Sequence, residues 1–383
     1  YGRYFARIPN DLAARALSAD QLITADYFDE GLTRPIPEGV LAGPEGNQTT
    51  QHFSLQGATA DVIDPDAKST AFTEVVTGVE YEAIAGLNVG ARYVYRNLDR
   101  LLEDVTMFSL VAGDLGLPGA DSIDYILTNP GPDTPTAGGL GASFEEPVHT
   151  YHAIELTADK RFRNSWSLHT SYRYSRLRGT VEGFFRDDNG QSDPGITSLY
   201  DFPTNDPSYT AIGGPQFGYR GDIRYLGKLG EGPLPLDRPH QVKIYGSYTF
   251  PFGVNLGTGI DLSSGKPLTP LAANPSYTTS GEIPEGPRGS GFETVDGFRT
   301  RTPFVSEVNL HVDYSLRFGA GPRLTLIGDL FNLFNRKTVL DYDNFTESTF
   351  GSPNPNFGQP RSLADGPAIQ APFSVRLGVR YSF

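Results

Sequence analysis

The side chains that could do chemistry are few, and the most suggestive are the acidic residues of one short stretch. Asp187, Asp188 and Asp193 stand close together around an Asn-Gly-Gln turn, and carboxylate and amide oxygens are the ligands that Ca²⁺ prefers. The stretch lacks the alternate acidic spacing of an EF-hand loop. A solvated surface loop is therefore the competing interpretation. We expect no resident cofactor; whether this loop binds Ca²⁺ is an open question at this stage.

Catalytic motifs are missing from the sequence. The chain has neither a Gly-x-Ser-x-Gly nucleophile elbow nor a His-Glu-x-x-His zinc motif. It also has no Cys, which excludes disulfides, thiolate zinc sites and a Cys nucleophile. We therefore predict that the chain is not an enzyme. Its net charge of −14 argues against a nucleic-acid partner, because phosphate-binding surfaces need clustered Lys and Arg.

A second set of polar side chains recurs at every other position of alternating stretches. In residues 87–97, for example, Arg92 and Arg96 oppose a face of Leu, Val, Ala and Tyr. A charge that faced lipid near the midplane would cost about 2–4 kcal/mol, so we predict that these side chains face a watery lumen or a plug. Whether some of them bind substrate is left open. The predicted set comprises Arg92, Arg96, His169, Arg173, Lys243, Glu307, Asp313, Arg376 and Arg380.

The elements that position these side chains are predicted to be strands. The alternating stretches are each about ten residues long, which is the length that a tilted strand needs to cross a bilayer. No apolar run approaches the roughly 20 residues of a spanning helix. We predict an all-β fold, an antiparallel transmembrane barrel of nine strands, or ten with residues 1–8. A soluble β-sandwich or propeller is the alternative. The nine stretches are residues 72–82, 87–97, 149–162, 166–177, 238–250, 254–263, 304–316, 323–334 and 373–383.

The connections between these stretches alternate in length. Short turns are expected near residues 83, 163, 251 and 319, whereas the other connections are long and rich in Gly, Pro, Asp and Asn. Outer-membrane barrels have short periplasmic turns and long extracellular loops. We divide the chain into residues 1–70, the end of one strand plus a long extracellular loop, and residues 71–383, the barrel strands. The long loops are residues 98–148, 178–237, 264–303 and 335–372. Neither a plug domain nor a signal peptide is recognised.

Aromatic and apolar residues gather at the strand ends. Leu377, Val379, Tyr381 and Phe383 alternate along the final stretch, and an amphipathic last strand with a terminal aromatic is typical of the signal read by the barrel-assembly machinery. The alternative is an ordinary last strand. Other aromatic residues near strand ends, Tyr245 and Tyr248 in one stretch among them, are predicted to form girdles at the membrane interfaces.

Several short motifs match one family. They are Asp237-Arg238-Pro239-His240 before a strand, Ser264-Gly265-Lys266-Pro267 after one, Asp329-Leu330-Phe331-Asn332-Leu333-Phe334-Asn335, and the final Arg380-Tyr381-Ser382-Phe383. In order and placement they resemble TonB-dependent outer-membrane receptors. Residues 172–194 look like the Oar-like branch, whose members carry a carboxypeptidase-regulatory-like domain.

The resemblance implies a location in the bacterial outer membrane and a plugged barrel of about 22 strands, of which this chain would be the C-terminal part. It implies active transport of a scarce solute or peptide, which the loops capture and the TonB system admits by moving the plug. The implied partners are lipid, the barrel-assembly machinery, and the TonB complex through N-terminal regions. A passive pore and a surface adhesion or structural protein remain alternatives. So does a small complete barrel, which would require residues 1–8 to pair with the last strand.

Overall fold

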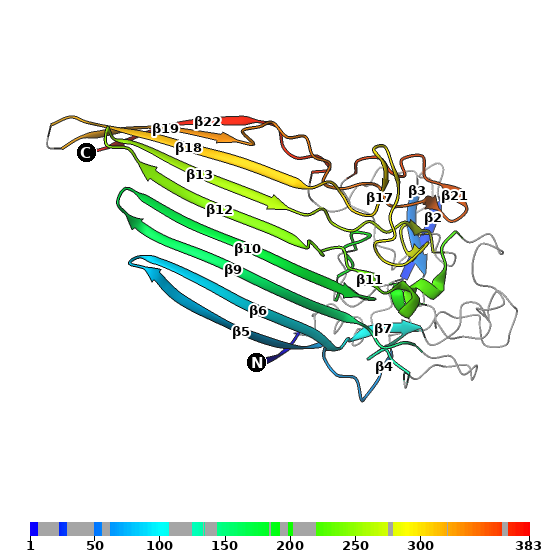
Figure 1. Ribbon diagram of the computed structural model, residues 1–383. Coiled ribbons are helices and arrows are strands. Elements are labelled where there is room, and N and C mark those ends of the chain that lie inside the picture. The colour runs from blue at the N-terminus through cyan, green and yellow to red at the C-terminus, as the bar shows by residue number, and fades with distance from the viewer. Residues whose placement is uncertain are drawn as a thin grey trace, which may run out of the picture.

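The structure is a computed structural model, shown in Figure 1, in which strands dominate. It describes residues 1–6, 23–28, 50–55, 62–106, 125–132, 134, 144–183, 185–191, 198–201, 220–274, 279–319, 321–361 and 367–383. The main sheet begins with the short strand β1 (Gly2–Phe5). Its long strands are β5 (Ala71–Ile84), β6 (Leu87–Arg100), β9 (His149–Arg163), β10 (Trp166–Gly179), β12 (His240–Thr249), β13 (Val254–Ser263), β18 (Val305–Arg317), β19 (Arg323–Phe331) and β22 (Ser374–Ser382).

Shorter elements lie in the connections. They are β2 (Ile23–Phe28), β3 (Thr50–Leu55), β4 (Val62–Ile63), β7 (Glu103–Thr106), β8 (Tyr125–Thr128), β11 (Gly232–Pro233), β14 (Leu271–Ala272), β15 (Ile283–Pro284), β16 (Phe292–Thr294), β17 (Gly297–Arg299), β20 (Glu347–Thr349) and β21 (Ser352–Pro353), with the 3₁₀ helices η1 (Ser198–Tyr200), η3 (Ile223–Leu226) and η4 (Lys228–Gly230). Among the described residues, no helix is long and apolar enough to span a membrane.

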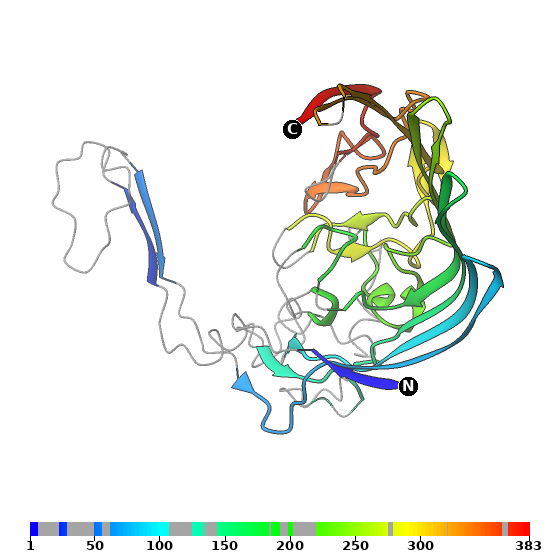
Figure 2. The same ribbon diagram turned by 90° about the vertical axis from the view of Figure 1, so that its left-hand side faces the viewer.

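Ten strands form one curved sheet in the order β1-β5-β6-β9-β10-β12-β13-β18-β19-β22, with the two-residue β11 added beside β10. All neighbours in this order are antiparallel, and Figure 2 shows the sheet bending as an arc. The prediction of an all-β, antiparallel barrel portion with nine or ten strands is confirmed. The alternation in the sequence produces this result because successive side chains of a strand point to opposite faces.

The sheet is open between its first and last strands in the described part of the chain. Strand β1 pairs with β5, with Tyr4 opposite Phe72, rather than with β22. Strand β22 pairs with β19, and the two chain ends lie apart in Figure 2. The alternative of a small complete barrel is therefore wrong, since it required residues 1–8 to pair with the last strand.

The two faces of the sheet differ in character. On the apolar face, side chains such as Val79 and Leu377 are 73% and 81% exposed, and similar residues follow one another across most of the long strands. A contiguous exposed apolar surface of this kind marks contact with a partner or a membrane rather than with water. The opposite face carries the charged residues and is called the polar face below. This division fits strands that contact lipid on one side.

Tight turns join the long strands at one end of the sheet. Asn164 and Ser165, between β9 and β10, both have positive φ, 55° and 68°, as in the two-residue hairpins whose twist matches that of the strands. Gly253 and Gly319 supply positive φ in the turns after β12 and β18. Because these turns are short, they fix the register of each hairpin.

The long connections gather at the other end of the sheet (Figure 1) and pack together there. We call the described residues of segments 98–148, 178–239, 264–304 and 332–373 the cap. The sequence suggested Gly- and Pro-rich loops, but these segments share buried apolar clusters. One cluster joins three of the four segments through Leu101, Val181, Tyr200 and Ile283, and another joins the last two segments. The cap is thus a folded body.

Candidate functional site

The polar face carries all nine charged residues predicted to line a lumen or contact a plug. Cross-strand pairing places Arg92 opposite Gly78 and Glu155, and it continues in the same parity through Lys243, Asp313 and Arg376 to the last strand. The strand register therefore places all nine residues on one face. Their role toward a lumen or a plug stays a prediction.

Ion pairs tie neighbouring strands together on this face. Arg92 binds Glu155 of the next strand, and the Arg96 Nε donates to Glu74 Oε2 at 2.9 Å. Arg376 donates from Nη2 to Asp329 Oδ2 at 2.8 Å, which links β22 to β19. Each pair leaves the arginine side chain at least half exposed, so these pairs contribute modestly to stability. The charged side chains of this face remain in contact with solvent.

The acids predicted to oppose the arginines have other partners. Asp313 accepts from Asn255 Nδ2 at 2.9 Å and contacts His311 Nε2 at 3.2 Å, while Glu307 accepts from its own strand neighbour Asn309. Strand parity shows only that acids and bases share a face. The strand register, set by turns far from these residues, decides which ones meet.

One girdle assignment is wrong. Tyr245 lies on the polar face, where its hydroxyl donates to Asp261 Oδ1 at 3.1 Å and its ring stacks on His169 with centroids 6.4 Å apart. Tyr248, three residues later, lies on the apolar face opposite Trp166 and Leu256. Residues three positions apart on a strand lie on opposite faces, and residues two positions apart lie on the same face. The spacing between Lys243 and Tyr245 was therefore the signal that would have placed Tyr245 on the polar face.

A trough of about 630 Å³ runs across the polar face and is lined by residues from β9 to β19. Gly257 and Gly259 form part of its floor, where a Cβ would lie 3.3 Å from His311 and from the Tyr245 ring respectively. Around it stand Tyr245, His311 and Asp329. The His311 Nδ1 lies 2.6 Å from Asp329 Oδ1. The trough shows that the polar face is concave and that glycine keeps its floor low.

The family motifs meet where the strands join the cap. The Asp237 carboxylate accepts from Leu177 N at 2.7 Å and from Arg301 Nη2 at 2.5 Å, which links the end of β10 to the start of β18. Arg238 donates to the Ser264 carbonyl at 2.8 Å. His240 begins β12 on the apolar face, where its Nδ1 lies 2.9 Å from the Tyr172 hydroxyl. These motif residues therefore have structural roles at the junction.

The motif of residues 329–335 ends β19 with a tight turn. Asn332 is 3% exposed with φ of 47°, and Asn335 has φ of 48°. The Asn332 amide donates to the carbonyls of Arg336 and Ala371 at 2.8 and 2.7 Å and accepts from Arg336 N at 2.9 Å. Asn335 accepts from Phe373 N just before the last strand. Asparagine is favoured here because it tolerates left-handed backbone and bonds locally.

The last strand presents the predicted assembly residues on the apolar face. Leu377, Val379, Tyr381 and Phe383 are all exposed, and Tyr381 lies against Phe383 with ring centroids 6.0 Å apart. Among the described residues, β22 has a partner strand only on its β19 side, so it is an edge. An amphipathic edge strand is able to pair with another sheet edge, but recognition by the assembly machinery stays a prediction.

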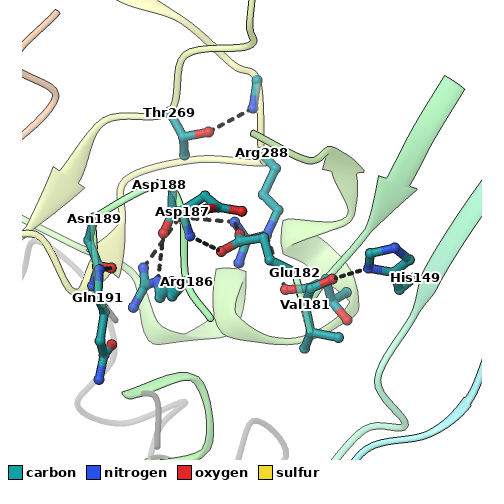
Figure 3. Close-up of polar contacts among 12 residues, drawn as sticks. His149, Val181, Glu182, Arg186, Asp187, Asp188, Asn189, Gln191, Thr269 and Arg288 are labelled. Atoms are coloured by element: carbon teal, nitrogen blue, oxygen red, sulfur yellow. Dashed lines mark hydrogen bonds and ion pairs between the residues drawn. The ribbon is translucent and has the colours of Figure 1, made fainter. Parts of the chain in front are cut away.

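The cap holds a buried charged cluster that the sequence did not reveal (Figure 3). Arg186 is fully buried; its Nε donates to Asp188 Oδ1 at 2.7 Å and its Nη2 donates to the Glu282 carbonyl at 2.7 Å. Its Nη1 lies 3.1 Å from Glu282 Oε2. Because Glu282 is 96 residues away, Arg186 joins two different cap segments.

A second buried arginine completes the cluster. Arg288 is 3% exposed, and its Nη1 contacts Glu182 and lies 2.9 Å from Asp188 Oδ2. Its Nε donates to the Thr180 carbonyl at 3.0 Å. Asn344, from a third segment, donates to the Asp188 carbonyl at 3.0 Å. We call Glu182, Arg186, Asp188, Glu282 and Arg288 the clasp.

Burial and charge shift the acidity of the clasp in opposite directions. Burial is the main cause that raises the pKa of Glu182 to about 7, because desolvation outweighs its contact with Arg288. Burial also acts to raise the pKa of Asp188, but Arg186 and Arg288 together outweigh it and hold that pKa below its ordinary value. Glu182 therefore gives up its proton at a higher pH than Asp188 does.

The acidic stretch considered for Ca²⁺ is only partly surface. Asp187 is exposed, whereas Asp188 is 7% exposed and binds two guanidinium groups; Asp193 lies outside the described residues. The solvated-loop interpretation is therefore wrong for Asp188. In the described part of the chain, no group of three or more His, Cys, Asp or Glu is arranged to hold a metal ion.

No known protein-family model matches the sequence. The TonB-dependent transporter Oar of Myxococcus xanthus is 26% identical over 441 residues, which cover all of this chain and 36% of that protein. Solved structures to which the chain is similar include two outer-membrane proteins. The Escherichia coli outer membrane transporter YddB is 11% identical, with a TM-score of 0.44, and the match covers 88% of this chain and 35% of YddB. The Pseudomonas aeruginosa ferripyoverdine receptor is 10% identical, with a TM-score of 0.43, and the match covers 83% of this chain and 28% of the receptor.

The chain spans about a third of the length of the relatives that it matches. The relative that matches along the whole chain is a transporter, in agreement with the prediction that the chain is not an enzyme. The family resemblance inferred from the motifs is confirmed as well, since the similarity to Oar covers every part of the chain. Along its whole length the chain is thus similar to a TonB-dependent transporter, and its fold and location are those of the C-terminal part of a bacterial outer-membrane β-barrel.

Proposed function

We propose that this chain forms the C-terminal wall of a TonB-dependent transporter that imports a scarce solute or peptide across the outer membrane. The observation that carries the proposal is the division of one continuous antiparallel sheet into an apolar face and a concave, charged face. Lipid would contact the first face and a plug the second. The cap would receive the solute at the outer surface.

The trough supports the assignment of the polar face to a plug. Its glycine floor and the partly exposed His169 and His311 around it suit a protein surface that must later move, because solvated ion pairs form and break at low cost. A sheet that packed permanently against another body would bury apolar side chains at this place instead. The proposal therefore assigns Arg92, Arg376 and their neighbours on the polar face to plug contact and lumen solvation.

The open edges support a larger barrel. An unpaired strand edge facing lipid leaves N–H and C=O groups without partners, at several kcal/mol each. Within the described residues β1 and β22 each pair with a strand on one side only, and we expect their other edges to pair with further strands. The similarity to a longer transporter supports this expectation. TonB would act through the regions that hold the plug, and lipid and the barrel-assembly machinery are the other proposed partners.

The test is energy dependence in the full-length protein. Cells that express it are expected to take up its solute only with a functional TonB system and an energised inner membrane. Reconstituted in liposomes without that system, it is expected to allow little passive swelling in sugar solutions. Uptake that is independent of TonB together with rapid swelling would indicate a passive pore, and neither uptake nor swelling would leave adhesion as the function.

A further inference from the structure

The clasp joins chain segments that are far apart in the sequence. Glu182, Arg186 and Asp188 come from the segment after β10, whereas Glu282 and Arg288 come from the segment after β13. The Asn344 amide adds the segment after β19 by donating to the carbonyls of Asp188 and Thr269, both at 3.0 Å. Separation of these segments would have to break the clasp.

The charges of the clasp do not balance. Three carboxylates, those of Glu182, Asp188 and Glu282, face two guanidinium groups, and the exposed fractions of these five side chains run only from 0% to 12%. A buried excess charge is costly unless a proton neutralises it.

Among the described residues nearby, Asp187 faces Glu182 and adds negative charge, while Lys266 faces Asp187 but binds Asp341. Asp201 faces Arg186 and Glu282, and burial raises its pKa well above its ordinary value, so it favours the neutral form. His149, whose Nδ1 lies 3.1 Å from the Val181 carbonyl, adds little positive charge because burial lowers its pKa.

Glu182 is the carboxylate best placed to hold that proton. Among the described residues it meets one guanidinium group, at one oxygen, while its other oxygen accepts from Asp187 N at 3.0 Å. Asp188, by contrast, binds both arginines, and Glu282 accepts from Arg186 and from Asn189 Nδ2. The excess negative charge is therefore least compensated at Glu182.

We propose that the clasp is a proton-dependent fastener of the cap: uptake of one proton at Glu182 neutralises the cluster and holds the three segments together, and its loss loosens them. This inference goes beyond the transport proposal and does not depend on it. It implies that the cap opens more readily in neutral or alkaline surroundings than in acidic ones.

The sign follows from linkage. The pKa of Glu182 is raised from 4.5 to about 7 in the closed cap, so the closed state binds the proton more tightly than the open one. The stabilisation that this proton adds is fully present below pH 4.5 and is lost as the pH rises to about 7. Asp188 has the opposite sign, but its lowered pKa acts only below its ordinary value of 3.8. The window of interest is therefore pH 5–8.

The experiment introduces one Cys into this chain, which has none of its own, in protein assembled in outer-membrane vesicles. Val181 is 1% exposed and adjoins Glu182, so a thiol reagent reaches Val181→Cys only when the cap opens. Dividing its labelling rate by that of the exposed Ser352→Cys removes the pH dependence of the thiol itself. With the two pKa values above, this ratio is expected to be about 30-fold higher at pH 8 than at pH 5.5.

Two further variants identify the group responsible. Glu182→Gln is expected to make the ratio independent of pH, whereas Glu293→Gln, an exposed carboxylate of the same cap, should keep the 30-fold change. If the labelling ratio does not change between pH 5.5 and pH 8 in the protein that keeps Glu182, the proposal is overturned, and this result requires no substitution in the clasp. A slope that persists in Glu182→Gln would overturn it as well. Neither result bears on transport, which is measured separately.

Discussion

Replacement of Val312 by Arg tests which face of the sheet contacts lipid. Val312 lies in the middle of β18, between Leu256 of β13 and Gly328 of β19, and its side chain points to the apolar face. An arginine on the lipid face near the midplane costs about 2–4 kcal/mol. The folded-to-unfolded ratio should therefore fall about 30- to 1,000-fold, since each 1.4 kcal/mol is a factor of ten.

The adjacent residue supplies a matched control. His311 lies at nearly the same depth but lines the trough, where its side chain is 44% exposed and faces Asp329 and Asp313. Arginine at this position can donate to the same two carboxylates and remain in water. We therefore expect His311→Arg to change stability by less than about 1 kcal/mol.

The assay is unfolding of the full-length protein from lipid vesicles in increasing urea, followed by tryptophan fluorescence and by the heat-dependent gel mobility of folded barrels. Val312→Arg should lower the urea midpoint strongly, and His311→Arg should leave it near that of the parent. Equal tolerance of the two variants would refute the assignment of the faces, because it would mean that both positions contact the same medium.

Three other predictions follow from the fold. On intact cells an impermeant thiol reagent should label Ser352→Cys in the cap and spare Asn164→Cys in the turn between β9 and β10; the reverse pattern would invert the topology. Asn332→Ala, which loses three local hydrogen bonds and a residue suited to positive φ, should lower the free energy of unfolding by about 2–4 kcal/mol in urea titrations. Arg186→Leu leaves buried carboxylates uncompensated and should destabilise the cap by about 3–5 kcal/mol, measured by hydrogen exchange of cap amides; Arg224→Leu, at an exposed position, should leave the exchange of these amides close to that of the parent.

The sequence was sufficient to predict the strands and the division of their faces. Alternation with a period of two is a local property, so Arg92 and Arg96 could be assigned to one face from their neighbours alone. The short turns near Asn164 and Gly319 were visible for the same reason, because turn residues are chosen by their own backbone angles. The one misplaced aromatic, Tyr245, obeys the same rule, because it lies two positions from Lys243 and on the same face; its assignment to a girdle did not apply the rule.

Contacts between distant segments required the tertiary structure. Arg96 meets Glu74 across a hairpin and Arg376 meets Asp329 across 47 residues, and these partners depend on register, which a one-residue shift would change completely. The motif residue Asp237 looked like a family signature, but its role in holding Arg301, 64 residues on, is a property of the folded junction.

The cap is the part that sequence reasoning missed. Leu101 stands beside one other Leu between charged residues, and Val181 and Ile283 are single apolar residues among polar, Gly and Pro neighbours. None of them belongs to a helical or strand periodicity, so each segment looked like an independent loop. Arg186 and Glu282 looked like ordinary surface charges for the same reason. Local pattern determines how a residue's own segment folds and which face it presents; burial of these residues arises only when segments some hundred positions apart pack together, and that packing is decided by the whole fold.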